Sequence, residues 1–323
     1  MEPQKEPNPN YLSYPPLPQS KEDEIDLLEL FKALWKGKWI IIVTAFIFAT
    51  SSVLYALSLP NIYKADTLLA PAENSRGGGL SQMAGQLGGL AALAGVNFGS
   101  SETSQTDLAV QVMMSRQFIE SYINKHDLLV PLMAVKDWDI NSNKLIIDDE
   151  IYNAENKKWL RKPVGLRGAK PSEQEAYEKF KEKLTINLDK DSGLYTVSIK
   201  YYSPFIAQEW VTWLVTDIND VMRKRTIAES TQNLSYLNTQ LQKTAVADMQ
   251  STFYKLIEEQ TKSLMLAEVQ DEFIFKTVDP AVVPEVKVEP RRTLICLLGA
   301  FVGIIFGGFI SIIIFYLKPK GSK

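Results

Sequence analysis

The chain has little of the chemistry on which most enzymes and many exported proteins depend. Its 323 residues include one cysteine, Cys296, and one histidine, His126. A single cysteine cannot form a disulfide within the chain, so the fold has to rest on apolar burial. A single histidine excludes a His-based metal site or catalytic triad built from one chain. We therefore expect neither a cofactor nor a catalytic centre.

Charged side chains are also absent from two long apolar stretches, residues 39–59 and 293–317. A helix needs roughly 20 apolar residues to cross a bilayer, and core helices of soluble proteins seldom run this long without polar residues. The first stretch does not resemble a cleaved signal peptide, because it begins near residue 39 and no small-residue cleavage site follows it. We predict two transmembrane helices.

Lysines flank both stretches on the same side of the predicted membrane. They are Lys32, Lys36 and Lys38 before the first stretch, and Lys318, Lys320 and Lys323 after the second. Positive charge favours the cytoplasmic side, although Arg291 and Arg292 lie at the opposite end of the second stretch. The pattern predicts cytoplasmic segments at 1–38 and 318–323 and an external domain over 60–292, which is long enough for its own core.

The segment before the first stretch has two parts. Residues 1–20 carry six prolines among polar residues, which predicts a disordered tail. Residues 23–36 predict a short amphipathic helix, which either lies at the membrane interface or simply leads into the span.

Residues 76–99 hold eight of the chain's seventeen glycines, interleaved with leucine and alanine. Glycine costs about 1 kcal/mol relative to alanine in a helix, so a stable lone helix is disfavoured, while the apolar content does not suit a solvated linker. We expect a loop that contacts other subunits or lines a lumen, with a disordered connector as the alternative. The residues predicted to do so are Gly85, Leu87, Gly88, Gly89, Leu90, Leu93 and Gly95.

Several elements of the external domain follow from periodicity and turn residues. The sequence predicts a strand at 62–70, helices at 107–126 and 172–184, a hairpin of strands at 184–188 and 194–201, and a strand at 272–278. Ser172 and Glu175 have the spacing of a capping box. The stretch 128–167 mixes tryptophan, charge and short apolar runs, and its fold is not predictable in detail.

Ser203-Pro204 is a helix start, and no proline or glycine follows until beyond residue 271. The spacing predicts one helix over about 204–271, roughly 100 Å long at 1.5 Å per residue, with room for a short break near Asp248. Its narrow apolar stripe, which includes Leu234, Leu237 and Leu241, requires a partner helix in the same chain or in a neighbour.

The predicted fold class is an α+β periplasmic domain, with a membrane-proximal α/β base and one very long helix, anchored by two transmembrane helices. A ring of subunits with their helices side by side would bury the apolar stripe. We therefore expect a homo-oligomer that faces its neighbours through Leu234, Leu237 and Leu241.

A proline-rich stretch precedes the second apolar stretch, within which Gly299, Gly303 and Gly307 recur every four residues. Glycines at that spacing let another transmembrane helix approach closely. Pro284, Pro290, Arg291, Gly303 and Gly307 fall where the signature of the Wzz chain-length-determinant family has Pro, Pro, Lys, Gly and Gly. Three positions depart from the signature: Ala281 replaces its first proline, Glu289 its serine and Arg291 its lysine.

The order of elements and the Gly-Leu run at 86–95 also resemble this family, the polysaccharide co-polymerases. The resemblance implies a homo-oligomeric periplasmic cage in the bacterial inner membrane. Such a protein regulates how many repeat units a Wzy-type polymerase adds to a lipid-linked glycan, often O-antigen, and has no catalytic centre of its own.

Other classes of function have less support. The kinase-bearing relatives need a P-loop, which is absent, and only six residues follow residue 317. The carboxylate clusters 148–150 and 258–259 are typical of a solvated face, and the mixed basic and acidic residues do not suggest nucleic-acid binding. A membrane sensor would need a cytoplasmic output domain, and neither of the predicted cytoplasmic segments, 1–38 and 318–323, suits one. A component of a polysaccharide export complex is the alternative that the glycine-rich segment also fits.

Overall fold

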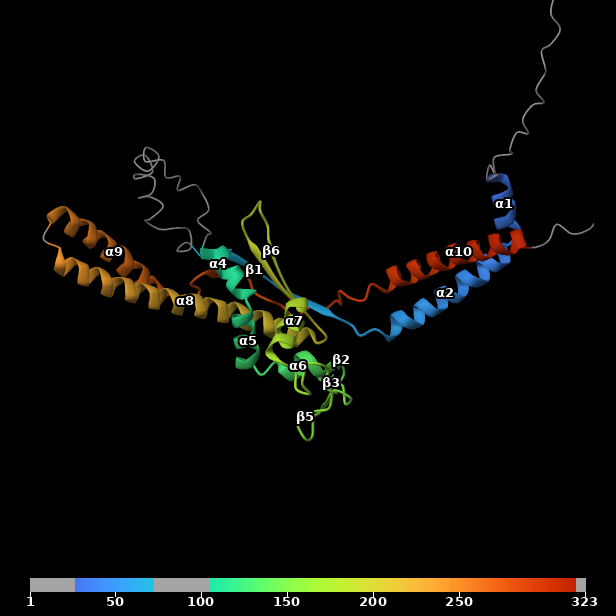
Figure 1. Cartoon of the computed structure of the whole chain (residues 1–323), viewed down its shortest axis with the longest axis horizontal. Helices are drawn as coiled ribbons and strands as arrows, with labels where there is room; N and C mark the ends of the chain where they lie inside the picture. The colour runs from blue at the N-terminus through green and yellow to red at the C-terminus, as the bar shows by residue number, and fades with distance from the viewer. Residues whose placement is uncertain (1–26, 73–104, 245, 318–323) are drawn as a thin grey trace, which may run out of the picture. The chain divides into compact units, whose positions relative to one another are not determined.

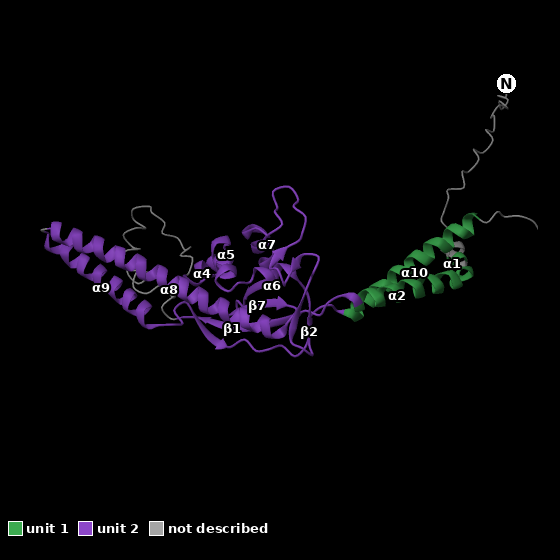
Figure 2. Ribbon diagram, turned by 90° about the horizontal axis from the view of Figure 1, so that it is seen from below, with its two compact units in different colours: residues 1–57, 292–323 green, residues 58–291 purple. Residues whose placement is uncertain are grey.

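The computed structural model describes residues 27–72, 105–244 and 246–317, which form two compact units (Figures 1 and 2). Unit 1 takes its described residues from 1–57 and 292–323, and unit 2 comprises residues 58–291. The helices of unit 1 are α1 (Leu27–Lys36), α2 (Lys38–Ser58) and α10 (Arg292–Leu317). The predicted tail at 1–20 and the glycine-rich segment lie outside the described residues.

Unit 2 is built around a four-stranded antiparallel sheet with the strand order β6-β7-β1-β8. The strands are β1 (Tyr63–Pro71), β6 (Leu184–Leu188), β7 (Tyr195–Tyr201) and β8 (Phe275–Asp279). The predicted β6–β7 hairpin is confirmed. Its turn ends at Gly193 with φ +70°, a left-handed conformation that glycine adopts without strain. The returning strand was predicted at 272–278; it begins at Phe275 and pairs with β1.

One long helix, α8 (Pro204–Lys243), covers the sheet with its first half. Ser203 caps it, since its hydroxyl accepts a hydrogen bond from the Ile206 amide. Trp210, Leu214 and Ile218 lie one helical turn apart and are fully buried against strand residues of the core. Burial of each such side chain stabilises the fold by about 1.5–3 kcal/mol.

The structure corrects the prediction of one continuous helix over 204–271, and the break for which the sequence left room near Asp248 lies between Lys243 and Ala247. The α8 helix is 40 residues long and ends at Lys243, and α9 (Ala247–Val269) runs back beside it. Thr244 and Val246 both have extended backbone, with ψ of 119° and 120°. Both are β-branched and are weaker helix formers than their neighbours, and the Gln250 side chain donates to the Thr244 carbonyl, 2.7 Å away.

The helical hairpin of α8 and α9 gives the apolar stripe of α8 a partner in the same chain. Ser230 lies 3.5 Å from Ser263, and the Asn233 amide donates to Gln260 at 3.3 Å. Three leucines follow Ser230 at helical spacing on the same side of α8 and are half-buried. They are Leu234, Leu237 and Leu241.

A single buried side chain, Asn219 of α8, fixes the chain where α9 returns to the sheet. Its Nδ2 donates to the Phe275 carbonyl at 3.1 Å, and its Oδ1 accepts from the amides of Ile274 and Phe275, both at 2.9 Å. These bonds satisfy backbone groups that would otherwise be buried without partners. Asn219 therefore sets where β8 begins.

The predicted helix over 107–126 is also corrected, because it consists of two helices, α4 (Gln105–Met113) and α5 (Arg116–Lys125). Ser115 has extended backbone, and its hydroxyl accepts from the Phe118 amide at 3.3 Å. A serine that caps a new helix competes with continuation of the one before it.

The stretch that the sequence left unassigned forms a small helix and two short hairpins. They are α6 (Leu129–Ala134), β2 (Val135–Asp139), β3 (Lys144–Ile147), β4 (Tyr152–Asn153) and β5 (Lys158–Trp159), and α7 (Glu173–Lys183) follows them. The capping box predicted for α7 is confirmed: Ser172 and Glu175 bond reciprocally. Trp138 in β2 packs edge-on against Tyr63, the first residue of β1, with ring centroids 5.9 Å apart.

We expect the stability of the folded protein to rise between pH 8 and pH 10. Burial of Lys183, together with the like charge of Lys179, lowers the pKa of Lys183 from 10.5 to about 8. The unfolded chain therefore binds more protons than the folded chain in this window, so the free energy of unfolding increases with pH. Above pH 10 the trend should reverse, because burial raises the pKa of Tyr122 and Tyr201 above the ordinary value of 10.

The test is thermal unfolding of the whole chain in detergent from pH 7 to 10. Lys183→Met should raise the free energy of unfolding at pH 7 by about 1–3 kcal/mol and flatten the rise. The rings of Tyr201 and Tyr202 lie 5.3 and 5.1 Å from the Lys183 ammonium and favour its charged form, which reduces the expected gain below the upper end of this range. Lys181→Met, at an exposed position of the same helix, is the matched control. If the free energy of unfolding of Lys183→Met rises with pH as steeply as that of the unchanged chain, the rise does not come from Lys183.

Candidate functional site

The candidate functional site is the seam along which α2 and α10 meet. A Cβ added to Gly303 would lie 2.8 Å from the Ala45 Cα, and one added to Gly307 would lie 2.8 Å from the Ile41 Cα. A Cβ added to Gly299 would overlap the Ser52 side chain. Real Cβ atoms do not approach other atoms so closely. The three glycines therefore permit contact between the helix backbones, as small residues do in pairs of membrane helices.

Polar side chains of the seam donate their hydrogens to backbone carbonyls. The Thr44 hydroxyl lies 2.9 Å from the Ile40 carbonyl of its own helix and 3.2 Å from the Gly303 carbonyl of α10. Ser311 of α10 donates to the Ala33 carbonyl of α1 at 2.9 Å, in the space that Gly37 leaves open. Hydroxyls bonded in this way carry no unsatisfied polar group into an apolar environment.

The outer faces of α2 and α10 are apolar and exposed. In both helices the buried positions are small residues: Ala56, Gly303, Gly307, Gly308 and Ser311. Large apolar side chains cover the rest, and both helices are long and apolar enough to cross a membrane. This distribution is the reverse of a soluble helix pair, which would bury its large side chains in the contact.

The proline-rich segment before α10 is held against the start of the sheet. The Ile62 amide donates to the Glu289 carbonyl at 2.9 Å, and the Val288 amide donates to the Ile62 carbonyl at 2.8 Å. Lys287 donates to the Asn61 side chain at 2.9 Å. The segment is therefore pinned to the residues that link α2 to β1.

Two positions that depart from the Wzz signature make contacts in this segment. The Glu289 carboxylate pairs with Lys200 of β7 at 2.6 Å, and the Ala281 carbonyl accepts from Gln208 of α8 at 3.1 Å. The ion pair is partly exposed and contributes at most about 1 kcal/mol. Pro284 and Pro290 are half-buried, and the Arg291 residue is exposed. Both positions therefore help to hold the segment against α8 and β7.

The one histidine has a structural environment. His126 Nε2 lies 2.9 Å from one oxygen of the buried Asp217 carboxylate, and Lys125 lies 2.6 Å from the other. The imidazole stacks on Trp213 with ring centroids 4.4 Å apart. Asp217 therefore joins the end of α5 to α8, and its two oxygens are occupied by Lys125 and His126.

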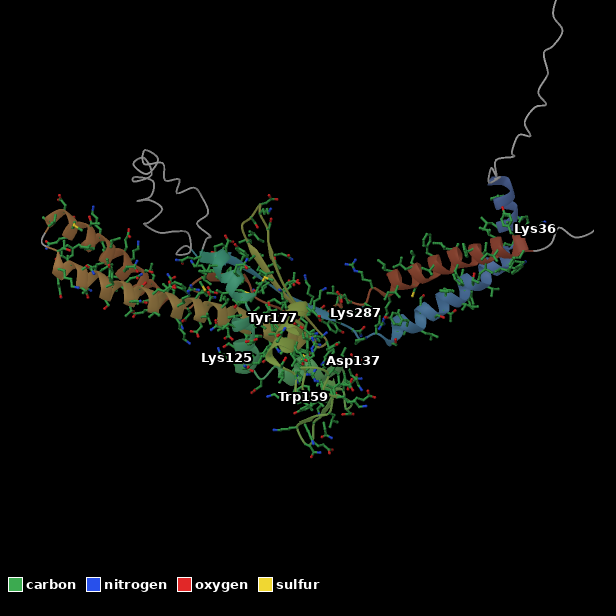
Figure 3. All side chains as sticks on the ribbon, viewed as in Figure 1. Lys36, Lys125, Asp137, Trp159, Tyr177 and Lys287 are labelled. Atoms are coloured by element: carbon green, nitrogen blue, oxygen red, sulfur yellow. The ribbon has the colours of Figure 1, made fainter. Side chains whose placement is uncertain are left out.

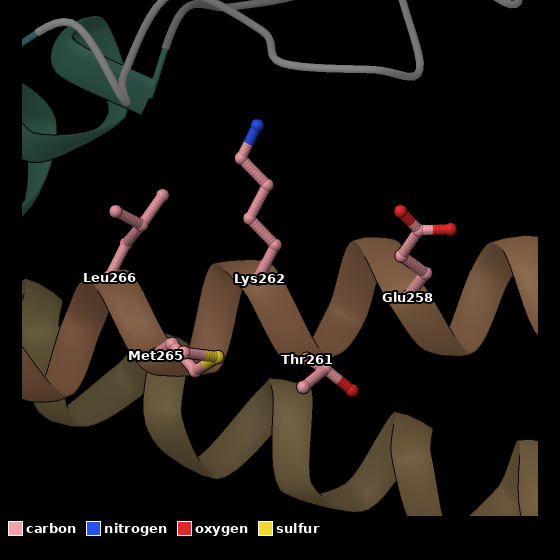
Figure 4. A pocket seen from close by; sticks show the side chains of 5 residues that line it. All are labelled: Glu258, Thr261, Lys262, Met265 and Leu266. Atoms are coloured by element: carbon pink, nitrogen blue, oxygen red, sulfur yellow. The ribbon is translucent and has the colours of Figure 1, made fainter.

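The described residues offer little for chemistry elsewhere. Among them, no group of three or more His, Cys, Asp and Glu residues could hold a metal. Glu258 lines a hollow of about 360 Å³ on α9 together with Thr261, Lys262, Met265 and Leu266 (Figure 4). In that view Glu258 and Lys262 point away from α8, as expected for a solvated helix face.

The site residues named from the sequence have three outcomes. Gly299, Gly303 and Gly307 lie together in the seam. The seven residues of the glycine-rich loop, from Gly85 to Gly95, lie outside the described residues. The stripe leucines of α8 are half-buried in the hairpin, so their role between subunits stays a prediction. The sequence analysis missed Thr44, although small polar residues within an apolar stretch are a signal of helix packing.

The fold and the seam define a class of protein, in which two paired apolar helices flank one α+β domain that carries a helical hairpin. Residues 23–126 match the family model of Wzz, described as chain length determinant protein. This match confirms the resemblance to the Wzz family that the sequence indicated. The two apolar helices suit a protein that crosses a membrane twice.

Solved structures with similarity to this chain include two co-polymerases. One is a full-length bacterial polysaccharide co-polymerase, at 14% identity and a TM-score of 0.37, with 93% of this chain and 100% of that chain covered. Another is a fragment of WzzB, a polysaccharide co-polymerase from Salmonella Typhimurium, at 13% identity and a TM-score of 0.28, with 71% and 100% covered. No curated protein matches the chain.

We predict that Gly303→Leu and Gly307→Leu each separate α2 from α10. A leucine at either position would meet a backbone Cα atom, which cannot move aside as a flexible side chain can. The expected cost is about 1–3 kcal/mol, read as a lower unfolding temperature in detergent and a shifted glycan length distribution in cells. Val302→Leu is the control, since Val302 is exposed on the same helix. A normal glycan distribution at normal expression would count against a role for the seam.

Proposed function

We propose that this protein is a non-enzymatic regulator of polysaccharide chain length. It acts as a co-polymerase with a Wzy-type polymerase on a lipid-linked glycan, and the glycan is O-antigen. The proposal is supported by the match of residues 23–126 to the chain length determinant family, together with the glycine seam, which contains the two glycines that fit the family's signature, Gly303 and Gly307.

The proposed topology places both termini in the cytoplasm and residues 60–292 in the periplasm. The lysines that flank α2 and α10 on one side support this orientation, because positive charge favours the cytoplasmic side. The polymerase and the growing glycan would then meet the α+β domain outside the inner membrane. The seam of α2 and α10 would lie within the bilayer.

The proposed assembly is a homo-oligomer with the helical hairpin at subunit contacts. The hairpin leaves large apolar residues exposed on both helices, beyond the leucines that it half-buries itself. They are Tyr236, Met249, Tyr254, Met265 and Val269. A neighbouring hairpin would remove this surface from water, and each fully buried side chain of this size contributes about 1.5–3 kcal/mol.

A regulator without a catalytic centre has to act through binding. An oligomer that holds the polymerase and the glycan near each other raises their effective concentration, so that more units are added before the glycan leaves. The extent of that retention depends on how many subunits contribute contacts. In this scheme the modal length is a property of the assembled oligomer and not of any single residue.

The experiment is a lipopolysaccharide gel from a strain in which this gene is deleted and then restored. Deletion should replace a clustered ladder of glycan lengths by a random one, and restoration should recover the cluster. The control is restoration with the Val302→Leu chain, which should also recover it. If the surface glycan disappears while the lipid-linked polymer is still made, the protein belongs to an export complex and the proposal is wrong.

A further inference from the structure

The stretch between Glu155 and Glu173 is strongly basic in a chain whose net charge is -3. It contains no acidic residue and six basic ones, and we call residues 157–170 the basic loop. The six are Lys157, Lys158, Arg161, Lys162, Arg167 and Lys170. A concentration of one charge on an otherwise acidic protein indicates a surface for an anionic partner.

The tip of the basic loop is apolar and turned outward. Val164 is 72% exposed and Leu166 is fully exposed. The Val164 and Arg167 backbones bond to each other in both directions, at 2.9 and 3.0 Å, around Gly165 with its left-handed φ of +60°. The tight turn therefore holds two branched apolar side chains in water, which is unfavourable unless another surface covers them.

The base of the basic loop is held by α7. Arg161 and Arg167 both pair with the buried carboxylate of Glu175, and the Arg161 Nε donates to the Ala169 carbonyl at 2.8 Å. The four lysines of the loop have no carboxylate partner within the described part of the chain. Two arginines thus fix the shape of the loop, and four lysines remain for a partner.

The basic loop follows the hairpin that packs on the start of β1. Trp138 of that hairpin contacts Tyr63, which is five residues beyond the end of α2 at Ser58. Five residues of extended chain span at most about 18 Å. Asp148 ends that hairpin, and its carbonyl accepts hydrogen bonds from the amides of Ile151 and Tyr152, at 3.0 and 2.9 Å, where the next hairpin begins. Figure 3 labels Asp137 of β2 and Trp159 of β5, which belong to these two hairpins.

From this arrangement we propose that the basic loop docks on the surface of an anionic phospholipid bilayer, the one in which α2 and α10 are anchored. Lysines bind the anionic headgroups, and Val164 and Leu166 enter the region between headgroups and acyl chains. The lysine stems cover apolar surface while their ammonium groups stay at the headgroups. This docking rests on anchoring by the two helices, not on control of glycan length.

The test uses the whole chain with Cys296→Ser, so that one engineered cysteine can be labelled. Leu166→Cys carries a polarity-sensitive fluorophore, and the protein is placed in nanodiscs of phosphatidylcholine with or without phosphatidylglycerol. A lipid with a quencher on its acyl chain reports contact. We expect a blue shift and quenching in the anionic discs, and loss of both when Lys157, Lys158 and Lys162 are replaced by glutamine.

The matched control is Asp191→Cys, in the exposed and mixed-charge turn between β6 and β7. Its fluorophore should keep the emission of a probe in water in both kinds of disc. Equal behaviour of the two sites would overturn the proposal. A blue shift at Leu166→Cys without quenching would also overturn it, because protein, such as a second copy of the chain, would then cover the tip instead of lipid.

Discussion

Backbone hydrogen bonds between Ile62 and the Val288–Glu289 segment hold the two ends of unit 2 together, and the rest of the fold depends on this closure. The α2 helix ends four residues before Ile62, and α10 begins three residues after Glu289. Each of the two apolar helices therefore has one end within a few residues of these hydrogen bonds. Two helices that flank a domain in the sequence can pair only if the first and last residues of that domain lie close together. These hydrogen bonds hold them there.

The sheet and the hairpin of α8 and α9 are built from the chain between Ile62 and Glu289. β1 follows Ile62 as a central strand, α8 crosses the sheet and continues beyond it, and α9 brings the chain back to β8 beside β1. Asn219 fixes the point at which the chain returns from α9 to the sheet, because it bonds three backbone groups of Ile274 and Phe275. The hairpin can thus be long and exposed at its far end, because its return is fixed at its base.

Local signals predicted most of the elements, and contacts between distant residues decided those that were missed. The β6–β7 hairpin and the cap of α7 depend on neighbouring residues, so the sequence predicts them well. The break at Thr244–Val246 follows no proline or glycine, because pairing of α8 with α9 stabilises a turn that local propensity only permits. Likewise, the spacing of the glycines predicted a contact face, while Thr44 and Ala45 opposite them became evident only from the structure.

The most direct test of the central claim, that α2 and α10 pair within one chain, is a disulfide between Phe48→Cys and Phe306→Cys in a Cys296→Ser background. The two phenylalanine rings meet across the pair of helices, with centroids 5.7 Å apart, and neither position is a glycine of the seam. A protease site inserted in the 190–193 turn then cuts the oxidised chain in two. Pairing within one chain predicts that both fragments stay joined at the mass of one chain until a reductant is added. Fragments that separate without reductant, or that join into dimers, would contradict it.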